Sequence, residues 1–227
     1  MPSKKVIVAL DSNNLEKIIK LVKSLKNDVK AFKIGYEFFF NFGLDGYRKI
    51  FLICPKIFLD LKMHDIPNTV GNGIRALQKI EPLFTTVHIS GGDEMMQSTK
   101  KHKNKIKILG VSILTSLDNI QTKKYFNQKN ISLLVKKFAK QAKKNGLDGV
   151  VCSPMEIKYI RKQVGKNFII VTPGIRVDNK IISDDQKRVA TPKEAIDLGA
   201  NYLVIGRPIT NSKNPLNVLK EINKTLS

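Results

Sequence analysis

The sequence lacks the features that identify several classes of protein. It has no tryptophan and only two cysteines, Cys54 and Cys152, which form neither a disulfide framework nor the paired spacing of a zinc site. No apolar run approaches the roughly 18 residues that a membrane helix needs. The first residues enter a strand-like segment without the apolar core of a signal peptide. We therefore expect a cytoplasmic protein without a membrane span, whose two thiols are free and buried.

Acidic residues and arginines are also scarce. The 227 residues include 19 Asp and Glu against 40 Lys and Arg, a formal net charge of +21, yet only six of the basic residues are arginine. Recognition of bases and phosphates in nucleic acids draws heavily on the bidentate arginine fork. The lysines are scattered in pairs without interleaved aromatic residues and are densest at 100–107. We expect a solvated lysine-rich surface and no specific nucleic-acid partner, with a basic nucleic-acid-binding protein as the alternative.

Short apolar runs rich in β-branched residues recur along the chain and predict eight strands. Stretches with helical periodicity lie between them, and one follows the last run. Continuous apolar runs are typical of parallel strands buried on both faces. Eight strand–helix units in this length predict a single α/β domain over residues 1–227, a (β/α)8 TIM barrel, with a doubly wound open sheet as the alternative. The strands are expected at 5–10, 31–35, 57–62, 84–90, 107–114, 148–153, 168–174 and 201–206, and helices at 15–25, 70–80, 131–146, 192–200 and 215–226.

Polar residues stand where the predicted strands end. In a barrel of this kind the functional site lies at the carboxyl ends of the strands, so side chains from different strands should meet at one mouth. In chain order these residues are Asp11, Lys33, Asp60, Lys62, His88, Thr115, Ser116, Arg176, Gly206 and Arg207.

The most informative stretch is DLKMHDIPNT, residues 60–69. Because side chains alternate along a strand, Asp60 and Lys62 are expected on the same side, in the barrel interior. A charge buried there needs a partner, and Lys33 comes from the neighbouring strand while Asp65 follows in the loop. The residues Lys33, Asp60, Lys62 and Asp65 are the candidate catalytic network, with an ion pair that merely fills the barrel as the alternative.

A second candidate site follows the eighth predicted strand. The segment VIGRPIT offers Gly206 for close backbone approach, Arg207 as a fork and Pro208 for a first helical turn, which suits a phosphate. The polar stretch 175–190 is too long for an ordinary strand–helix connection and predicts a mobile lid over the phosphate, with Gln186 as its ligand-touching residue. A merely disordered loop is the alternative.

No motif demands a metal or a cofactor, and we expect neither. The chain has no GxGxxG, P-loop or HExxH sequence, and its three histidines are scattered. His88 suits a core histidine with its hydrogen bonds satisfied. His102, inside the lysine run, is expected at the surface.

Several segments together resemble one family, the bacterial orotidine 5'-phosphate decarboxylases. They are VIVALD, FKIG, DLKMHDIPNT, HISGG, VSILTS, GLDGVVCS, VTPGIR, DDQKRVATP and VIGRP, and the resemblance runs from about residue 6 to 220. It implies a barrel that converts a mononucleotide to UMP in pyrimidine biosynthesis without a cofactor. It also implies a homodimer whose two active sites lie at the subunit interface.

The resemblance also implies roles for individual residues. Asp11 and Lys33 would bind the ribose hydroxyls, and Lys62 would stabilise and protonate a carbanion at C6 of the pyrimidine. Asp65 and Thr69 would come from the partner subunit, and Thr115 would contact the base. The phosphate end or its lid would be met by Arg176, Gln186, Gly206 and Arg207.

Two other barrel chemistries stay open. An aldolase-type lysine forms a Schiff base, but carboxylates beside Lys62 disfavour the neutral amine that this chemistry requires. Related barrels act on sugar phosphates with a magnesium ion, and HDIPNT and VTPGIR argue against them.

Overall fold

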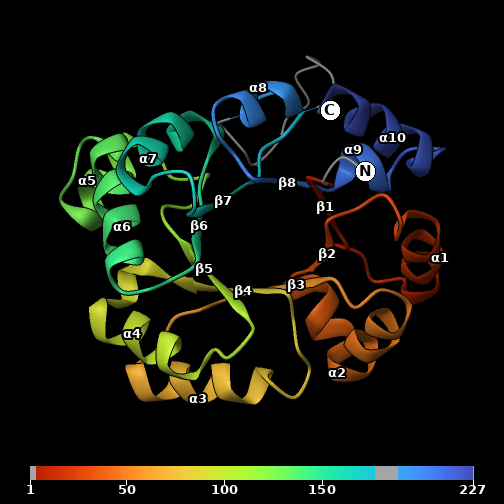
Figure 1. Cartoon of the computed structure of the whole chain (residues 1–227), viewed down its shortest axis with the longest axis horizontal. Coiled ribbons are helices and arrows are strands. Elements are labelled where there is room, and N and C mark those ends of the chain that lie inside the picture. Colours follow the sequence, from red (N-terminus) through yellow and green to blue (C-terminus); the bar gives the residue numbers. More distant parts are fainter. Residues whose placement is uncertain (1–3, 177–188, 227) are drawn as a thin grey trace.

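The computed structural model describes residues 4–176 and 189–226, and its eight strands close into a parallel barrel in sequence order (Figure 1). Each expected strand is present within a few residues of its expected bounds. The first strand pairs with the eighth, so the (β/α)8 barrel is confirmed and the open sheet is wrong. The strands are β1 (Val6–Ala9), β2 (Ala31–Ile34), β3 (Ile57–Met63), β4 (Phe84–His88), β5 (Lys107–Val111), β6 (Gly149–Val151), β7 (Ile169–Thr172) and β8 (Tyr202–Ile205).

Helices surround the barrel on its outside (Figure 1). All five expected helices are present, and α1 has the expected bounds because the Asn14 side chain caps it by accepting a hydrogen bond from the Lys17 amide. The helices are α1 (Leu15–Leu25), α2 (Tyr36–Ile53), α3 (Pro67–Leu77), α4 (Asp93–His102), α5 (Asn119–Phe126), α6 (Ile131–Lys144), α7 (Ile157–Val164), α8 (Pro192–Asp197), α9 (Arg207–Thr210) and α10 (Pro215–Thr225). Two short 3₁₀ turns, η1 (Ile89–Gly91) and η2 (Pro154–Glu156), follow β4 and β6.

The core has two parts, one on each side of the strands. The larger part packs the outer strand faces against the helices and includes Leu59. The smaller part includes Ile7, Phe58 and Phe84, whose side chains share the other face of their strands. The rings of Phe58 and Phe84 meet edge to face with centroids 5.9 Å apart. Since Asp60 and Thr86 lie two residues further along the same strand faces, the apolar centre gives way to polar groups toward the carboxyl ends.

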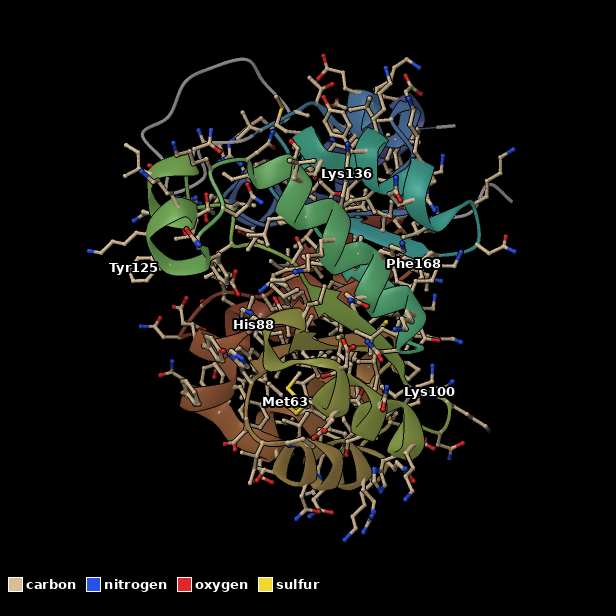
Figure 2. The ribbon with its side chains drawn as sticks, turned by 90° about the vertical axis from the view of Figure 1, so that its left-hand side faces the viewer. Met63, His88, Lys100, Tyr125, Lys136 and Phe168 are labelled. Carbon is tan, nitrogen blue, oxygen red and sulfur yellow. The ribbon has the colours of Figure 1, made fainter. Side chains whose placement is uncertain are left out.

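Two expectations about the surface and the thiols are met. Cys54 and Cys152 are free and buried. Many lysine side chains are exposed on the outer faces of the helices, with Lys100 on α4 as an example (Figure 2). Across the ranges 4–176 and 189–226, every helix is too short or too polar to cross a membrane.

Candidate active site

A cavity of about 310 Å³ opens at the carboxyl ends of the strands. Apolar side chains such as Phe58, Val111 and Val204 form part of its wall. The structure brings eight of the predicted site residues together here, drawn from both halves of the barrel: Asp11, Lys33, Asp60, Lys62, Thr115, Arg176, Gly206 and Arg207.

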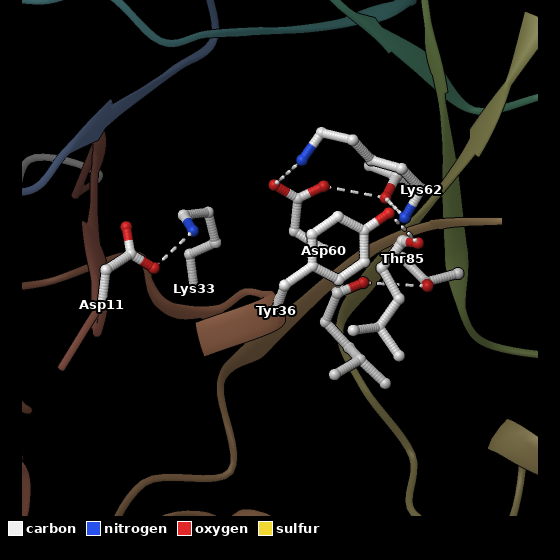
Figure 3. A network of polar contacts seen from close by, with 9 residues as sticks. Asp11, Lys33, Tyr36, Asp60, Lys62 and Thr85 are labelled. Atoms are coloured by element: carbon white, nitrogen blue, oxygen red, sulfur yellow. Dashed lines mark hydrogen bonds and ion pairs between the residues drawn. The ribbon is translucent and has the colours of Figure 1, made fainter. Parts of the chain in front are cut away.

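Asp60 and Lys62 on β3 form an ion pair inside this cavity (Figure 3). The Lys62 Nζ lies 2.8 Å from Asp60 Oδ2, and Asp60 is only 8% exposed. The other carboxylate oxygen, Oδ1, accepts a hydrogen bond of 2.8 Å from the Thr86 hydroxyl on β4. Because both oxygens of Asp60 accept hydrogen bonds, the arrangement fits an ionised carboxylate. The pair therefore presents an ammonium group to whatever occupies the cavity.

Lys33 forms a second, separate ion pair. Its Nζ lies 3.0 Å from Asp11 Oδ1, and β1 and β2 place the two side chains together by pairing Ala9 with Lys33. Gly35 makes room for this pair, since a Cβ there would lie 2.9 Å from the Lys33 ammonium. In this single chain the charges are thus arranged as two pairs, Asp11–Lys33 and Asp60–Lys62.

Asp65 and Thr69 lie on the surface, outside the set of residues that line this cavity. Asp65 Oδ1 accepts a hydrogen bond of 2.7 Å from the amide of Ile66. Thr69 is in the first turn of α3 and is also exposed. Both side chains are accessible to a second subunit.

The predicted phosphate end lies where β8 meets α9. Gly206 precedes the helix, Arg207 begins it, and Pro208 occupies its first turn as expected. A Cβ at Gly206 would touch the Cβ of Ala9 at 3.4 Å, so the glycine leaves the backbone open toward the cavity. Arg207, at the start of α9, and Arg176, after β7, line the same cavity.

The two ends of the predicted lid are joined by backbone hydrogen bonds. The Arg176 amide donates to the Ala190 carbonyl at 3.0 Å, and the Ala190 amide donates to the Gly174 carbonyl at 3.2 Å. Gln186, like the rest of 177–188, lies outside the described residues, so its predicted contact with the ligand stays a prediction.

The histidines have different environments. His88 ends β4 and faces His64, with ring centroids 5.1 Å apart. Burial lowers the pKa of His88, the electrostatic effects of His64 and Lys62 lower it further, and Asp60 partly opposes this. His102 was expected at the surface, but it is partly buried, because its Nε2 lies 2.7 Å from the Arg75 guanidinium and its Nδ1 lies 2.8 Å from the Ser98 carbonyl.

The cavity suits an anionic ligand. Its charged lining consists of two carboxylates, Asp11 and Asp60, and four cations, Lys33, Lys62, Arg176 and Arg207. Clustered positive charge in a partly enclosed site strengthens the attraction for an anion. Groups of three or more His, Cys, Asp or Glu side chains that could hold a metal ion do not occur within 4–176 and 189–226.

Three residues near the Asp60–Lys62 pair were not predicted from the sequence, or were predicted only in part. Thr86 has no charge and suits any strand, so its bond to Asp60 carried no signal in the sequence. Tyr36 follows Gly35 in an aromatic run, a pattern that carries no signal for a role in a site. For His88, the position at the strand end was recognised, but its pairing with His64 was not.

Known proteins resemble the chain over almost its full length. The sequence model described as "Orotidine 5'-phosphate decarboxylase / HUMPS family" matches residues 4–222. An orotidine 5'-phosphate decarboxylase of Wolbachia pipientis subsp. Culex pipiens is 43% identical over 224 residues, covering 98% of each chain. The crystal structure of the Lactobacillus acidophilus decarboxylase superposes with a TM-score of 0.87 at 40% identity, covering 99% of this chain and 100% of that one. A Pyrococcus horikoshii decarboxylase superposes with a TM-score of 0.79 at 25% identity.

Proposed function

The chain belongs to the orotidine 5'-phosphate decarboxylase / HUMPS family, and we propose that it converts orotidine 5'-phosphate to UMP in pyrimidine biosynthesis. The observation that carries this proposal is the Asp60–Lys62 ion pair, which lies within a net-positive cavity that also contains two arginines. The substrate carries a carboxylate and a phosphate, so it needs positive charge at two places. The cavity supplies both.

The chemical step is the loss of CO2 from C6 of the pyrimidine. The bond between C6 and the carboxylate breaks, CO2 leaves, and the electron pair stays on C6 as a carbanion. Lys62 stabilises this charge through its ammonium and then transfers a proton to C6, which gives UMP; solvent reprotonates the amine. Preorganised charge of this kind is the largest catalytic contribution in many enzymes.

Asp60 has two roles in this mechanism. It fixes the Lys62 ammonium at 2.8 Å, and it places negative charge near the substrate carboxylate that departs. Repulsion between the two carboxylates raises the energy of the bound substrate and is relieved when CO2 leaves. Lys33 and Asp11, as the second pair, bind the ribose hydroxyls, and Thr115 contacts the pyrimidine.

The phosphate end supplies binding energy at a distance from the reacting carbon. Arg176, Gly206 and Arg207 hold the phosphate, and Gln186, which lies outside the described residues, is proposed to contact it. Binding energy from such a remote group serves to order the reacting groups. Truncating the phosphate should therefore lower turnover as well as affinity.

A homodimer completes each site. Asp65 and Thr69 are exposed in the single chain and lie close in sequence to Lys62, at the start of α3. In a dimer they reach the partner's cavity, where Asp65 adds a second carboxylate beside Lys62 and completes, with Lys33, Asp60 and Lys62, the proposed network of four charges. Mixing Asp65→Asn chains with Lys62→Ala chains should restore activity at one site per mixed dimer, which a self-contained monomer cannot do.

The direct test follows the ultraviolet absorbance of orotidine 5'-phosphate after addition of purified protein dialysed against EDTA. We expect loss of the substrate absorbance and formation of UMP without added metal or cofactor. Persistence of the substrate would overturn the proposed function. Borohydride in the presence of substrate should trap no adduct on Lys62, since the mechanism forms no Schiff base.

A further inference from the structure

The backbone of β3 is irregular at the lysine of the proposed catalytic pair. Lys62 has φ 44°, in the left-handed region that residues with a side chain rarely adopt. The register between β3 and β4 also shifts between Leu59 and Met63. Strain of this kind, of the order of 1–3 kcal/mol per residue, persists only when the surroundings hold it in place.

Two side-chain hydroxyls hold the peptide unit between Leu61 and Lys62. Its carbonyl oxygen, on Leu61, accepts a hydrogen bond of 3.0 Å from the Tyr36 hydroxyl. Its amide, on Lys62, donates one of 2.9 Å to Thr86 Oγ1. The carbonyl and the amide of one peptide are therefore both held, by a residue at the start of α2 and by a residue within β4.

Thr86 connects this peptide to the carboxylate of the pair. Its oxygen accepts from the Lys62 amide while its proton goes to Asp60 Oδ1 at 2.8 Å. Since Asp60 Oδ2 in turn accepts from the Lys62 ammonium, the contacts form a closed ring that joins the backbone and the side-chain end of one lysine. The buried Thr86 hydroxyl thus holds both the backbone amide of Lys62 and the carboxylate of Asp60 in position.

We propose that Thr86 and Tyr36 are positioning residues, which clamp the Leu61–Lys62 peptide and so aim the Lys62 ammonium at the reacting carbon. This inference rests on the proposed decarboxylation. Neither residue acts on the substrate; both act through Lys62. Small displacements of a reacting group lower rates strongly, so the clamp should affect kcat more than substrate affinity.

The two hydroxyls should contribute unequally. Thr86 is fully buried, and its bond to an ionised carboxylate is of the stronger, charge-assisted type. Tyr36 is 47% exposed, so water can replace its hydroxyl at the Leu61 carbonyl. Its ring, centred 5.7 Å from the Lys62 Nζ, would remain after removal of the hydroxyl. We expect a large effect from Thr86 and a small one from Tyr36.

The decisive comparison is Thr86→Val against Thr85→Val. Both threonines are fully buried neighbours on β4, but Thr85 bonds the Leu59 carbonyl at 2.9 Å and belongs to the opposite face of the strand. Thr86→Val should lower kcat by about tenfold to hundredfold, the effect of losing one charge-assisted hydrogen bond, with little change in UMP affinity. Thr85→Val should lower the free energy of unfolding by an amount comparable to that in Thr86→Val but keep the wild-type kcat. Thr86→Ser, which restores the hydroxyl, should lie within about fivefold of wild type.

Each result separates the clamp from the function it serves. A wild-type protein without decarboxylase activity refutes the function itself. An active wild type with an unchanged kcat in Thr86→Val, or with Thr86→Ser as impaired as Thr86→Val, overturns the clamp. If Thr86→Val does not fold, Thr86→Ser and the change at the exposed position, Tyr36→Phe, test the clamp instead. A twofold to fivefold loss of kcat at constant UMP affinity in Tyr36→Phe supports the clamp, and an unchanged kcat refutes it.

Discussion

Replacing Lys62 by alanine tests the centre of the mechanism, because the change removes the proposed proton donor and breaks an ion pair at the same time. The two consequences have different sizes. They can therefore be separated by measuring turnover and stability on the same preparation.

The structural consequence is modest. At the observed 2.8 Å, two unit charges attract by about 6 kcal/mol at an effective dielectric constant of about 20, and desolvation offsets much of this. Removing one partner of a fully buried pair costs about 3–5 kcal/mol. The Lys62 side chain is 27% exposed, and Asp60 keeps its bond from Thr86, so we expect a loss of about 1–3 kcal/mol in the free energy of unfolding.

The chemical consequence is much larger. Loss of a general acid costs about 10²–10⁴ in rate, and loss of a preorganised charge costs about 10²–10³ more. We expect Lys62→Ala to lower kcat by at least about 10⁴-fold, which corresponds to more than about 5 kcal/mol of transition-state stabilisation. The arginines and Lys33 remain, so UMP should still bind.

Lys103→Ala provides a matched control. The Lys103–Asp148 pair is 2.6 Å long, and its side chains are 20% and 12% exposed, against 27% and 11% for Lys62 and Asp60. This pair lies at the amino ends of β5 and β6, away from the cavity. Lys107 also contacts Asp148, so the loss of stability should be no greater than in Lys62→Ala. Turnover should be unchanged.

The assays are the decrease in orotidine 5'-phosphate absorbance, chemical denaturation, and UMP binding by calorimetry. A Lys62→Ala protein that retains more than about a hundredth of wild-type kcat would refute the role of Lys62, since a general acid alone should account for that much. Loss of turnover together with loss of UMP binding would point to a collapsed site instead of missing chemistry.

Three further predictions concern the surroundings of the pair. Gly35→Ala should raise KM several-fold with little loss of stability, because the new Cβ would displace the flexible end of Lys33; an unchanged KM would contradict the role of the Asp11–Lys33 pair. Arg207→Ala should weaken UMP inhibition by about tenfold to hundredfold while leaving weak inhibition by uridine unchanged, since uridine has no phosphate. His88 has a pKa below its ordinary value of 6.5, so the unfolded chain binds a proton at this residue more readily than the folded chain. The contribution of neutral His88 to the free energy of unfolding is therefore fully present above pH 6.5. It decreases as the pH drops below 6.5 and stops decreasing below the native pKa. His88→Gln should reduce this decrease in denaturation experiments at pH 8 and pH 5, and equal decreases in both proteins would exclude His88 as a source.

The sequence predicted the barrel well because parallel strands are buried on both faces. Segments such as 57–62 and 201–206 are continuously apolar apart from the site residues and Asn201, and the structure has strands there. The helix α2 was not predicted, because its aromatic residues obscure the helical period and Gly43, with φ 54°, interrupts the helix. Closure of the barrel was indicated only by the number of strands, since no single segment records which strands become neighbours.

The charged residues of the candidate site could be predicted from the sequence, but Thr86 could not. Asp60, Lys62 and Lys33 are conspicuous because a charged side chain in an apolar strand is costly unless it has a partner. The pairing of Lys33 with Asp11 was not predictable, since it depends on the register of β1 against β2. The contribution of Thr86 needed two further facts that sequence does not contain, the shifted register of β3 and the left-handed backbone at Lys62.

The net charge of +21 has little to do with the selectivity of the site. Residues 100–146 hold thirteen lysines and one acidic residue, Asp118, so this fifth of the chain carries more than half of the excess. Two of these lysines, Lys103 and Lys107, lie at the amino end of β5. The cavity is at the other end of this strand, four residues further along, which corresponds to about 13 Å at 3.3 Å per residue. Both lysines also pair with Asp148, which offsets part of their positive charge, and the distance weakens what remains at the cavity. Recognition of a mononucleotide therefore depends on the few cations inside the cavity, and on the contacts that hold them in place.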